Sequence, residues 1–241
     1  AFPDGFYGNI FTGEVAGNLV HRDVITPHKT SPKYVASRAA EEKESEFITS
    51  TDSWFRPTSF AVSPDGNLYM VDMYRQHIET PMSIPEDLVA EMDYKQGMDM
   101  GRIYRIVPKK KKNLDRSLTS KENKSSADYV KLLAHESQWW RLQAQRKLIE
   151  SQDKSVVPAV VELFNSSNDA RYRLHALYTL EGLGALNSEL VKKALADRHA
   201  AVREHGAILS ERYPETKEAL AGLLNDQAPR VAFQATLSLI N

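Results

Sequence analysis

Residues 54–74 read WFRPTSFAVSPDGNLYMVDMY. A turn sequence, Ser63-Pro64-Asp65-Gly66-Asn67, separates two apolar runs at 59–62 and 68–71. In such a turn proline presets φ, aspartate can hydrogen-bond back to the backbone, and glycine accepts a positive φ. The flanking Tyr and Val residues favour extended backbone. The stretch therefore predicts a β-hairpin whose second strand ends in the polar and aromatic residues 72–75.

Short aromatic and β-branched runs surround this hairpin and predict further strands at 6–14, 18–25, 46–51 and 101–107. Residues 26–45 are polar and contain two prolines and a charge run, which predicts an exposed loop. Residues 76–100 read as an insertion with a short helix that begins at Pro85, because proline suits the first helical position. Residues 1–108 are thus predicted to form antiparallel sheet.

Charge is distributed unevenly along a chain whose formal net charge is −1. Residues 109–125 carry seven basic and two acidic side chains and almost no apolar ones. A segment of this composition buries too little surface to order itself, so we predict a basic flexible linker. Contact of residues 109–112 with phosphates or a membrane surface is the alternative interpretation. No large basic field exists elsewhere, which argues against nucleic acid as a partner.

Two features absent from the sequence exclude particular kinds of site and segment. The chain has no cysteine, so it has no disulfide, no Cys-type zinc site, no thiol nucleophile and no covalent haem attachment within these residues. No apolar run reaches the length of a transmembrane segment. The first residue is Ala1 rather than methionine, and we expect the chain to be a fragment of a larger protein.

A repeat begins at residue 126. The pattern Trp140-Arg141-Leu142-Gln143-Ala144 recurs from Tyr172, Val202 and Val231, at spacings of 32, 30 and 29 residues. A shorter apolar helical segment precedes each copy. Helix pairs at this period predict an α-solenoid of four HEAT-like pairs over residues 126–241, in which each pair buries a face on its neighbours.

The second residue of the repeat is arginine in three copies and Ala232 in the fourth. We interpret the recurring arginine as a structural ladder between repeats, with a binding role as the alternative. A solenoid suggests docking, either to a protein partner or to a neighbouring domain of the same chain.

Several motifs in residues 1–108 resemble one known family. They are Gly8-Asn9-Ile10-Phe11, Gly17-Asn18-Leu19-Val20-His21-Arg22, Trp54-Phe55-Arg56-Pro57, Ser63-Pro64-Asp65-Gly66-Asn67-Leu68-Tyr69, Asp72-Met73-Tyr74-Arg75 and Gly101-Arg102-Ile103-Tyr104-Arg105. This part of the chain resembles the last blades of the membrane-bound dehydrogenases of the Planctomycetes–Verrucomicrobia type, which are related to quinoprotein glucose and sorbosone dehydrogenases. In that family a six-bladed β-propeller precedes HEAT-like repeats.

The resemblance implies an α+β multidomain chain in which a partial β-propeller-type antiparallel sheet precedes the α-solenoid. It implies a periplasmic or extracellular quinoprotein-like sugar or alcohol dehydrogenase as the parent protein. That parent would bind pyrroloquinoline quinone with Ca²⁺, whereas this fragment is expected to hold no cofactor and to be inactive alone. The alternative from a different class is a non-enzymatic protein–protein interaction scaffold, and fold analogy does not separate the two.

Four residues near the hairpin are the candidate site. Asp72 and Tyr74 are the candidate catalytic groups, and Arg56 and Arg75 the candidate ligands of the cofactor carboxylates. In the structural alternative Asp72 caps a turn and Arg75 pairs with an acid such as Glu79. No metal site is predicted, because His21, His28 and His77 follow no ligand spacing.

Overall fold

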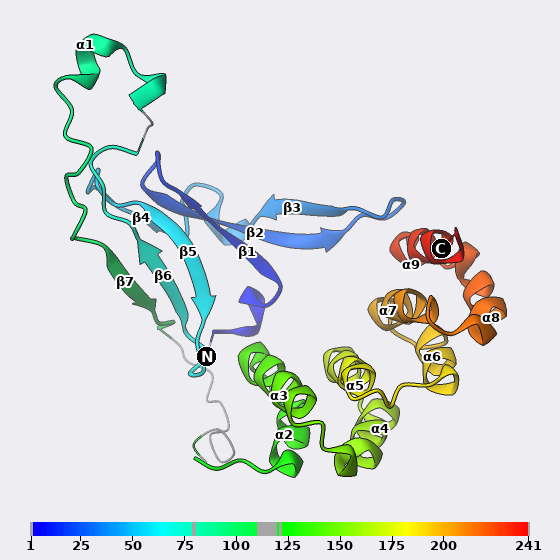
Figure 1. The fold of residues 1–241 in the computed structure, drawn as a ribbon. Helices are drawn as coiled ribbons and strands as arrows, with labels where there is room; N and C mark the ends of the chain where they lie inside the picture. The colour runs from blue at the N-terminus through cyan, green and yellow to red at the C-terminus, as the bar shows by residue number, and fades with distance from the viewer. Residues whose placement is uncertain (1, 79–80, 110–119, 121, 241) are drawn as a thin grey trace. The chain divides into compact units, whose positions relative to one another are not determined.

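The computed structural model describes residues 2–78, 81–109, 120 and 122–240. The chain has a mixed α/β fold with two antiparallel sheets, and its helices are concentrated in the C-terminal half (Figure 1). The chain divides into two compact units, each of which makes most of its contacts within itself. The β unit comprises residues 1–26 and 35–113, and the helical unit comprises residues 27–34 and 114–241.

The predicted hairpin is confirmed. Strands β5 (Pro57–Val62) and β6 (Leu68–Asp72) pair antiparallel, and β7 (Arg102–Ile106) joins the other edge of β6. In the turn, Asp65 Oδ1 accepts the Asn67 amide at 3.0 Å, and Gly66 has a φ of 72°. The buried Leu68 and Met70 alternate with more exposed neighbours along β6, so one face of this sheet covers the core.

The other sheet has the order β1-β2-β3, with β4 also paired to β2; its strands are β1 (Asn9–Glu14), β2 (Leu19–Pro27), β3 (Tyr34–Arg38) and β4 (Ile48–Thr49). The prediction that residues 26–45 are a loop was wrong, because β3 lies inside that range. All five side chains of β3 are exposed, so the strand has no hydrophobic alternation from which it could be predicted. Backbone hydrogen bonds to β2 define it instead.

The charge run after β3 also folds back onto this sheet. Arg22 is buried, with its Nε 2.9 Å from Glu42 Oε1 and its Nη1 3.1 Å from Asn9 Oδ1. Its Nη2 pairs with Glu41, and its guanidinium lies over the ring of Phe6. A buried arginine needs such partners, so both acids have a structural role, although Glu41 itself stays largely exposed.

Close backbone approach joins the two sheets within the β unit. A Cβ added to Gly13 of β1 would lie 2.2 Å from the carbonyl oxygen of Pro57 in β5. Only glycine leaves room for this crossing. The apolar cluster beside it contains the buried residues Val20, Phe55 and Met70.

The insertion after β6 contains the short helix α1 (Glu86–Val89), which Pro85 precedes as its N-cap, so the helix begins one residue later than predicted. Both acids of its first turn lie where the helix dipole favours them. Most of the predicted linker, residues 110–119 and 121, lies outside the described residues.

The described part of the helical unit contains eight α-helices. They are α2 (Ser126–Leu132), α3 (Gln138–Ser151), α4 (Val157–Ser166), α5 (Ala170–Gly182), α6 (Ser188–Leu195), α7 (Ala200–Ser210), α8 (Lys217–Ala221) and α9 (Pro229–Ile240). Consecutive helices pack as pairs, and α3, α5, α7 and α9 also pack side by side in one layer (Figure 1). The four sequence repeats are therefore four helices of the same layer.

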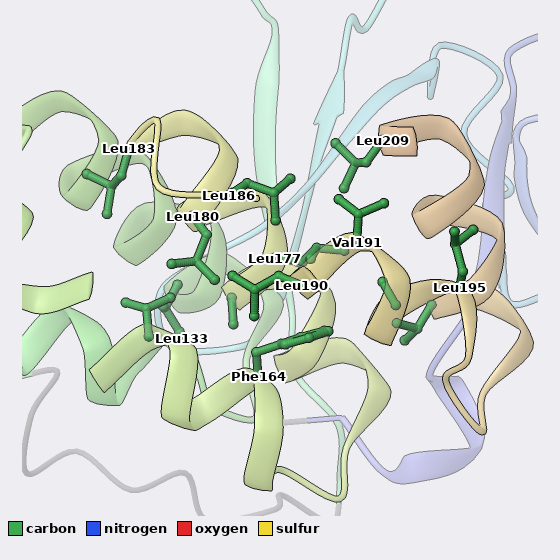
Figure 2. Packing of buried hydrophobic residues seen from close by; sticks show 14 of the residues in the cluster. Leu133, Phe164, Leu177, Leu180, Leu183, Leu186, Leu190, Val191, Leu195 and Leu209 are labelled. Atoms are coloured by element: carbon green, nitrogen blue, oxygen red, sulfur yellow. The ribbon is translucent and has the colours of Figure 1, made fainter. Parts of the chain in front are cut away.

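Leucine and valine side chains from all four pairs merge into one core, part of which Figure 2 shows. Leu177, Leu180 and Val191 have no exposed surface. Small residues permit the close helix contacts. A Cβ on Gly206 of α7 would lie 2.9 Å from the backbone of α6, so packing requires glycine at this position of the repeat.

The predicted arginine ladder is confirmed between the last three repeats. Arg173 donates through Nε and Nη2 to both carboxylate oxygens of Asp197, at 2.8 and 2.7 Å. Arg203 binds Asp226 in the same way, at 2.7 and 2.8 Å, and donates through Nη1 to the carbonyl of Asp197. Asp197 thus connects two successive arginines. Both pairs are nearly buried and bidentate, the geometry in which an Arg–carboxylate pair is most specific.

No helix among the described residues is both long enough and apolar enough to cross a membrane.

Candidate functional site

Asp72, the last residue of β6, is completely buried. Its Oδ1 accepts the amide of Arg56 at 2.8 Å and the amide of Tyr74 at 2.9 Å. Its Oδ2 has no hydrogen-bond partner among the described residues. The side chain therefore caps the turn after β6 and links it to the start of β5, as the structural alternative predicted.

Arg56 is also nearly buried, and each of its three guanidinium nitrogens donates to a backbone carbonyl. Nε binds Arg75 at 3.0 Å, Nη2 binds Gln76 at 2.9 Å, and Nη1 binds Val15 at 2.6 Å. These bonds hold three chain segments together at one corner of the β unit. Three of the five guanidinium N–H groups of Arg56 are used in this way, so two remain for any other acceptor.

Tyr74 has a φ of 49°, in the left-handed region that a side chain other than glycine rarely adopts. Its ring lies 5.6 Å from the Trp54 ring, and the Arg102 guanidinium lies 3.7 Å from the ring centre. Hydrogen bonds from the Trp54 amide and the Tyr74 hydroxyl hold the pKa of Asp52 below its ordinary value. Aromatic and charged neighbours therefore surround the Tyr74 side chain and fix its position.

The insertion returns to this corner at Gly97, whose φ is 83°. A Cβ at Gly97 would lie 2.3 Å from the carbonyl oxygen of Tyr74, so only glycine fits there. Nearby, Arg75 Nη1 donates to the carbonyl of Lys95 at 3.3 Å. Among the described residues the half-buried Arg75 side chain makes no other hydrogen bond, so it is the more available of the two predicted arginines.

The structure brings all four predicted residues to one corner, which we call the β6 corner: Arg56, Asp72, Tyr74, Arg75 and their neighbours Asp52, Trp54, Gly97 and Arg102. Their catalytic and cofactor-binding roles stay predictions. Glu79, the proposed partner of Arg75, lies outside the described residues. Sequence reasoning missed Asp52 and Gly97 as members. The Asp52-Ser53-Trp54 spacing, which suits a side-chain turn back to the backbone, was the available signal for Asp52.

Two features of the β6 corner are chemically unusual. A buried carboxylate oxygen without a hydrogen bond is costly, and Asp72 has one. A non-glycine residue in the left-handed region stores strain, and Tyr74 is such a residue. Together with Arg75 and Arg102 they form an acid, a phenol and two cations within one neighbourhood. This set can hold an anionic or hydroxyl-bearing group, at the cost of some existing contacts.

The histidines do not assemble a metal centre. Within the part of the chain that the structure describes, no group of three or more His, Asp or Glu residues could hold a metal ion. His21 contacts Glu46 at 2.8 Å and Asp23 at 3.2 Å, and the hydrogen bond that its ring donates to the Glu46 carboxylate raises the pKa of His21. In the helical unit, burial lowers the pKa of His205, which contacts the Tyr178 hydroxyl at 2.7 Å.

The chain was compared with curated proteins and with models of protein families. No curated protein matched the chain. Residues 1–110, which contain the whole β6 corner, match the model of a protein family described as a domain of unknown function, DUF7133.

Proposed function

We propose that this chain is a protein-binding scaffold, in which a partial β-propeller-type unit precedes an α-solenoid of HEAT-like pairs. The observation that carries the proposal is the contrast between the two units. At the β6 corner the polar groups of Arg56 and Asp72 bind the chain's own backbone. The helical unit instead repeats one helix in register four times, and in a solenoid such a repeat would present an extended surface suited to a partner.

The solenoid interpretation is supported by the arginine ladder and by the continuous core. In solenoids each repeat contacts its neighbours and stacks by a constant operation. Here Arg173 and Arg203 make equivalent bonds to the following repeat, and the buried leucines form one cluster across all four pairs. A protein partner, or a neighbouring domain of the same chain, is the expected ligand.

The propeller interpretation is supported by the sheet that contains β5, β6 and β7. Strands β5, β6 and β7 are consecutive, antiparallel and connected as a meander, which is how strands follow one another within a propeller blade. Among the described residues this sheet has three strands.

Lysine-directed cross-linking in source cells, read by mass spectrometry, tests the scaffold. We expect cross-links from the helical unit, at lysines such as Lys147 and Lys192, to one recurrent region of another polypeptide or domain. Lys43 in the β unit is the comparison site within the same chain. Cross-links confined to residues 1–241, or scattered over unrelated proteins at the same rate from all three lysines, would contradict the proposal.

The second candidate is a part of a secreted sugar or alcohol dehydrogenase of the quinoprotein type. The strained Tyr74 beside the fully buried Asp72 favours it, because strain and buried acids cluster at active sites. In the parent protein, pyrroloquinoline quinone with Ca²⁺ would accept two electrons from an alcohol. Arg75, together with Arg102, would bind its carboxylates, and Asp72 would hold or move a proton.

Calorimetric titration of the full-length parent with pyrroloquinoline quinone, with and without Ca²⁺, tests this second candidate. Binding that Arg75→Ala weakens at least tenfold, and that the exposed control Arg105→Ala leaves unchanged, would support the dehydrogenase. Absence of binding in a folded parent, or equal effects of the two substitutions, would rule out this cofactor site and leave the scaffold.

A further inference from the structure

His21, in strand β2, contacts a carboxylate with each of its two ring nitrogens. Nδ1 lies 2.8 Å from Glu46 Oε2, and Nε2 lies 3.2 Å from Asp23 Oδ1. A neutral imidazole has one N–H group and can donate to only one of these oxygens, whereas the protonated ring donates to both. The geometry therefore matches the charged form of His21.

Glu46 belongs to the segment between β3 and β4, residues 39–47, which we call the 39–47 loop. Four of its nine residues are glutamates, and three of these pair with cations of the sheet. The pairs are Glu41–Arg22, Glu42–Arg22, Glu46–Arg38 and Glu46–His21. The two arginines stay charged throughout the neutral range of pH. His21 is therefore the member of these pairs whose charge can change there.

Burial and neighbouring charge both act on the His21 ring. The side chains of His21, Asp23 and Glu46 are 27%, 24% and 19% exposed, so water screens their charges only in part. Arg38 lies 2.8 Å from the other oxygen of Glu46, and Glu42 acts in turn on Arg38. The hydrogen bond to Glu46 raises the pKa of His21 above its ordinary value, against the lowering effect of burial.

The adjacent strands add no charge at this point. Thr12 of β1 lies opposite His21, and β4 consists of Ile48 and Thr49. The ring is therefore governed by the two carboxylates that it contacts and by the arginine behind one of them.

The contact with Glu46 holds the 39–47 loop close to the point where it rejoins the sheet. Strand β4 begins two residues later, is only two residues long, and pairs with the two residues of β2 that precede His21. Between them, Phe47 packs against Phe11, with 4.8 Å between the ring centres. Two backbone pairs contribute little stability by themselves, so the position of this segment depends on its side-chain contacts.

We propose that His21 is a proton-operated latch: the protonated ring binds Asp23 and Glu46 together and fastens the 39–47 loop to β2, and loss of the proton loosens the loop. The proton leaves Nε2 for solvent, because the shorter contact keeps the N–H group of Nδ1 on Glu46. The Asp23 carboxylate then faces a lone pair of the ring, and the bond to Glu46 is no longer assisted by a positive charge. This device lies within the β unit and holds for either proposed function.

Hydrogen exchange of peptides that cover residues 39–49, corrected for the intrinsic exchange rate, tests the latch. Its contribution should be complete below about 6.5, the pKa of an unfolded histidine, and be lost as pH rises through the higher pKa of folded His21. We expect protection to fall about threefold or more across this range in the native chain. His21→Gln carries no titratable ring and should show no such fall, and peptides of α5 are the internal reference. The same fall in both proteins would overturn the proposal.

Nuclear magnetic resonance of the full chain with labelled histidine gives the pKa of His21 directly, and the His21→Gln spectrum assigns its signal. We expect a pKa above about 6.5 in the native chain and a lower pKa in Glu46→Gln, which removes the partner charge and keeps its shape. The control is Glu44→Gln, an exposed acid of the same loop, which should leave the pKa unchanged. Far-UV circular dichroism confirms that the variants fold. A pKa at or below about 6.5, or equal effects of the two substitutions, would overturn the proposal.

Discussion

Asp72 illustrates at the level of one residue how burial changes the meaning of a sequence motif. The motif Asp72-Met73-Tyr74-Arg75 presents an acid, a phenol and a cation, which suggested chemistry. In the structure one oxygen of Asp72 is used by two backbone amides. The other oxygen remains without a partner among the described residues. The residue therefore stabilises the turn, and its catalytic role stays a prediction.

Substitution of Asp72 measures how much its hydrogen bonds contribute to the stability of the hairpin. Asp72→Ala leaves two amides without an acceptor, so we expect a loss of about 3 kcal/mol in local stability. Asp72→Asn keeps a carbonyl oxygen and should lose about 1 kcal/mol. Hydrogen exchange of peptides across residues 54–74, with peptides of the helical unit as internal reference, gives both values.

The control for these variants is the exposed Asp99→Ala, for which we expect no change in the same peptides. If Asp72→Ala protected the hairpin as well as the native sequence does, the capping role would be wrong.

His175 gives a second residue-level prediction. Burial, and then the charge of Arg141, lowers the pKa of His175 to about 4, whereas an unfolded histidine titrates near about 6.5. Between these values the unfolded chain binds a proton that the folded chain does not. The free energy of unfolding should therefore fall as pH falls from about 6.5 to about 4, and be unaffected by this group above that window.

Denaturant unfolding at neutral and acidic pH, compared with His175→Gln, measures this contribution. The glutamine variant cannot titrate, so its stability should decline less over the window. The Nδ1 of His175 lies 2.7 Å from Gln145 Oε1, a contact that a glutamine amide can replace. An identical decline in both proteins would contradict the prediction.

At the scale of elements, the helices are stacked by two kinds of contact, a buried apolar core and a ladder of arginine–aspartate pairs. The leucine core fills the interior, and the Arg173–Asp197–Arg203–Asp226 ladder sets the register of one repeat on the next. Strand β3 is the opposite case, since it buries none of its side chains and is held by strand pairing and by the polar contacts of Arg38 with Ser45 and Glu46. Strand β7 is also mostly exposed, but its residues alternate in type and it was predicted, whereas β3 has no such pattern in its sequence.

Removal of one ladder arginine should be costly. In Arg173→Met the Asp197 carboxylate, whose side chain is only 9% exposed, loses its bidentate partner. We expect a loss of about 3–5 kcal/mol in the helical unit. Arg212→Ala removes a pair whose arginine is 72% exposed, so a loss below about 1 kcal/mol is expected.

Urea denaturation followed by far-UV circular dichroism separates these two variants. The measurement would argue against a structural ladder if both substitutions had the same small effect.

At the scale of the whole molecule, the two units have separate and unequal cores. The helical cluster contains 21 buried apolar residues, and the cluster of the β unit contains three, with no residue in common. Since buried apolar area is the main source of stability, we expect two unfolding transitions, with the β unit unfolding first.

Core truncations assign the transitions. Met70→Ala should lower only the free energy of unfolding of the β unit, which governs the first transition. Leu177→Ala should lower only that of the helical unit, which governs the second. Each loss should be about 2–5 kcal/mol. Calorimetry combined with hydrogen exchange reports on each unit. A single transition that both substitutions shift equally would show that the units unfold together.

The sequence alone determined the elements whose physics is local. The turn at 63–67 and the strands on either side of it follow from Pro, Asp and Gly chemistry and from alternation, and the helical period follows from the repeat. Tertiary structure decided what depends on distant partners. It placed β3 beside β2, brought Glu41 and Glu42 to Arg22, and put Gly97 against Tyr74. It also made Arg56 a donor to three carbonyls, because hydrogen-bond partners far apart in the chain leave no periodic signal in sequence.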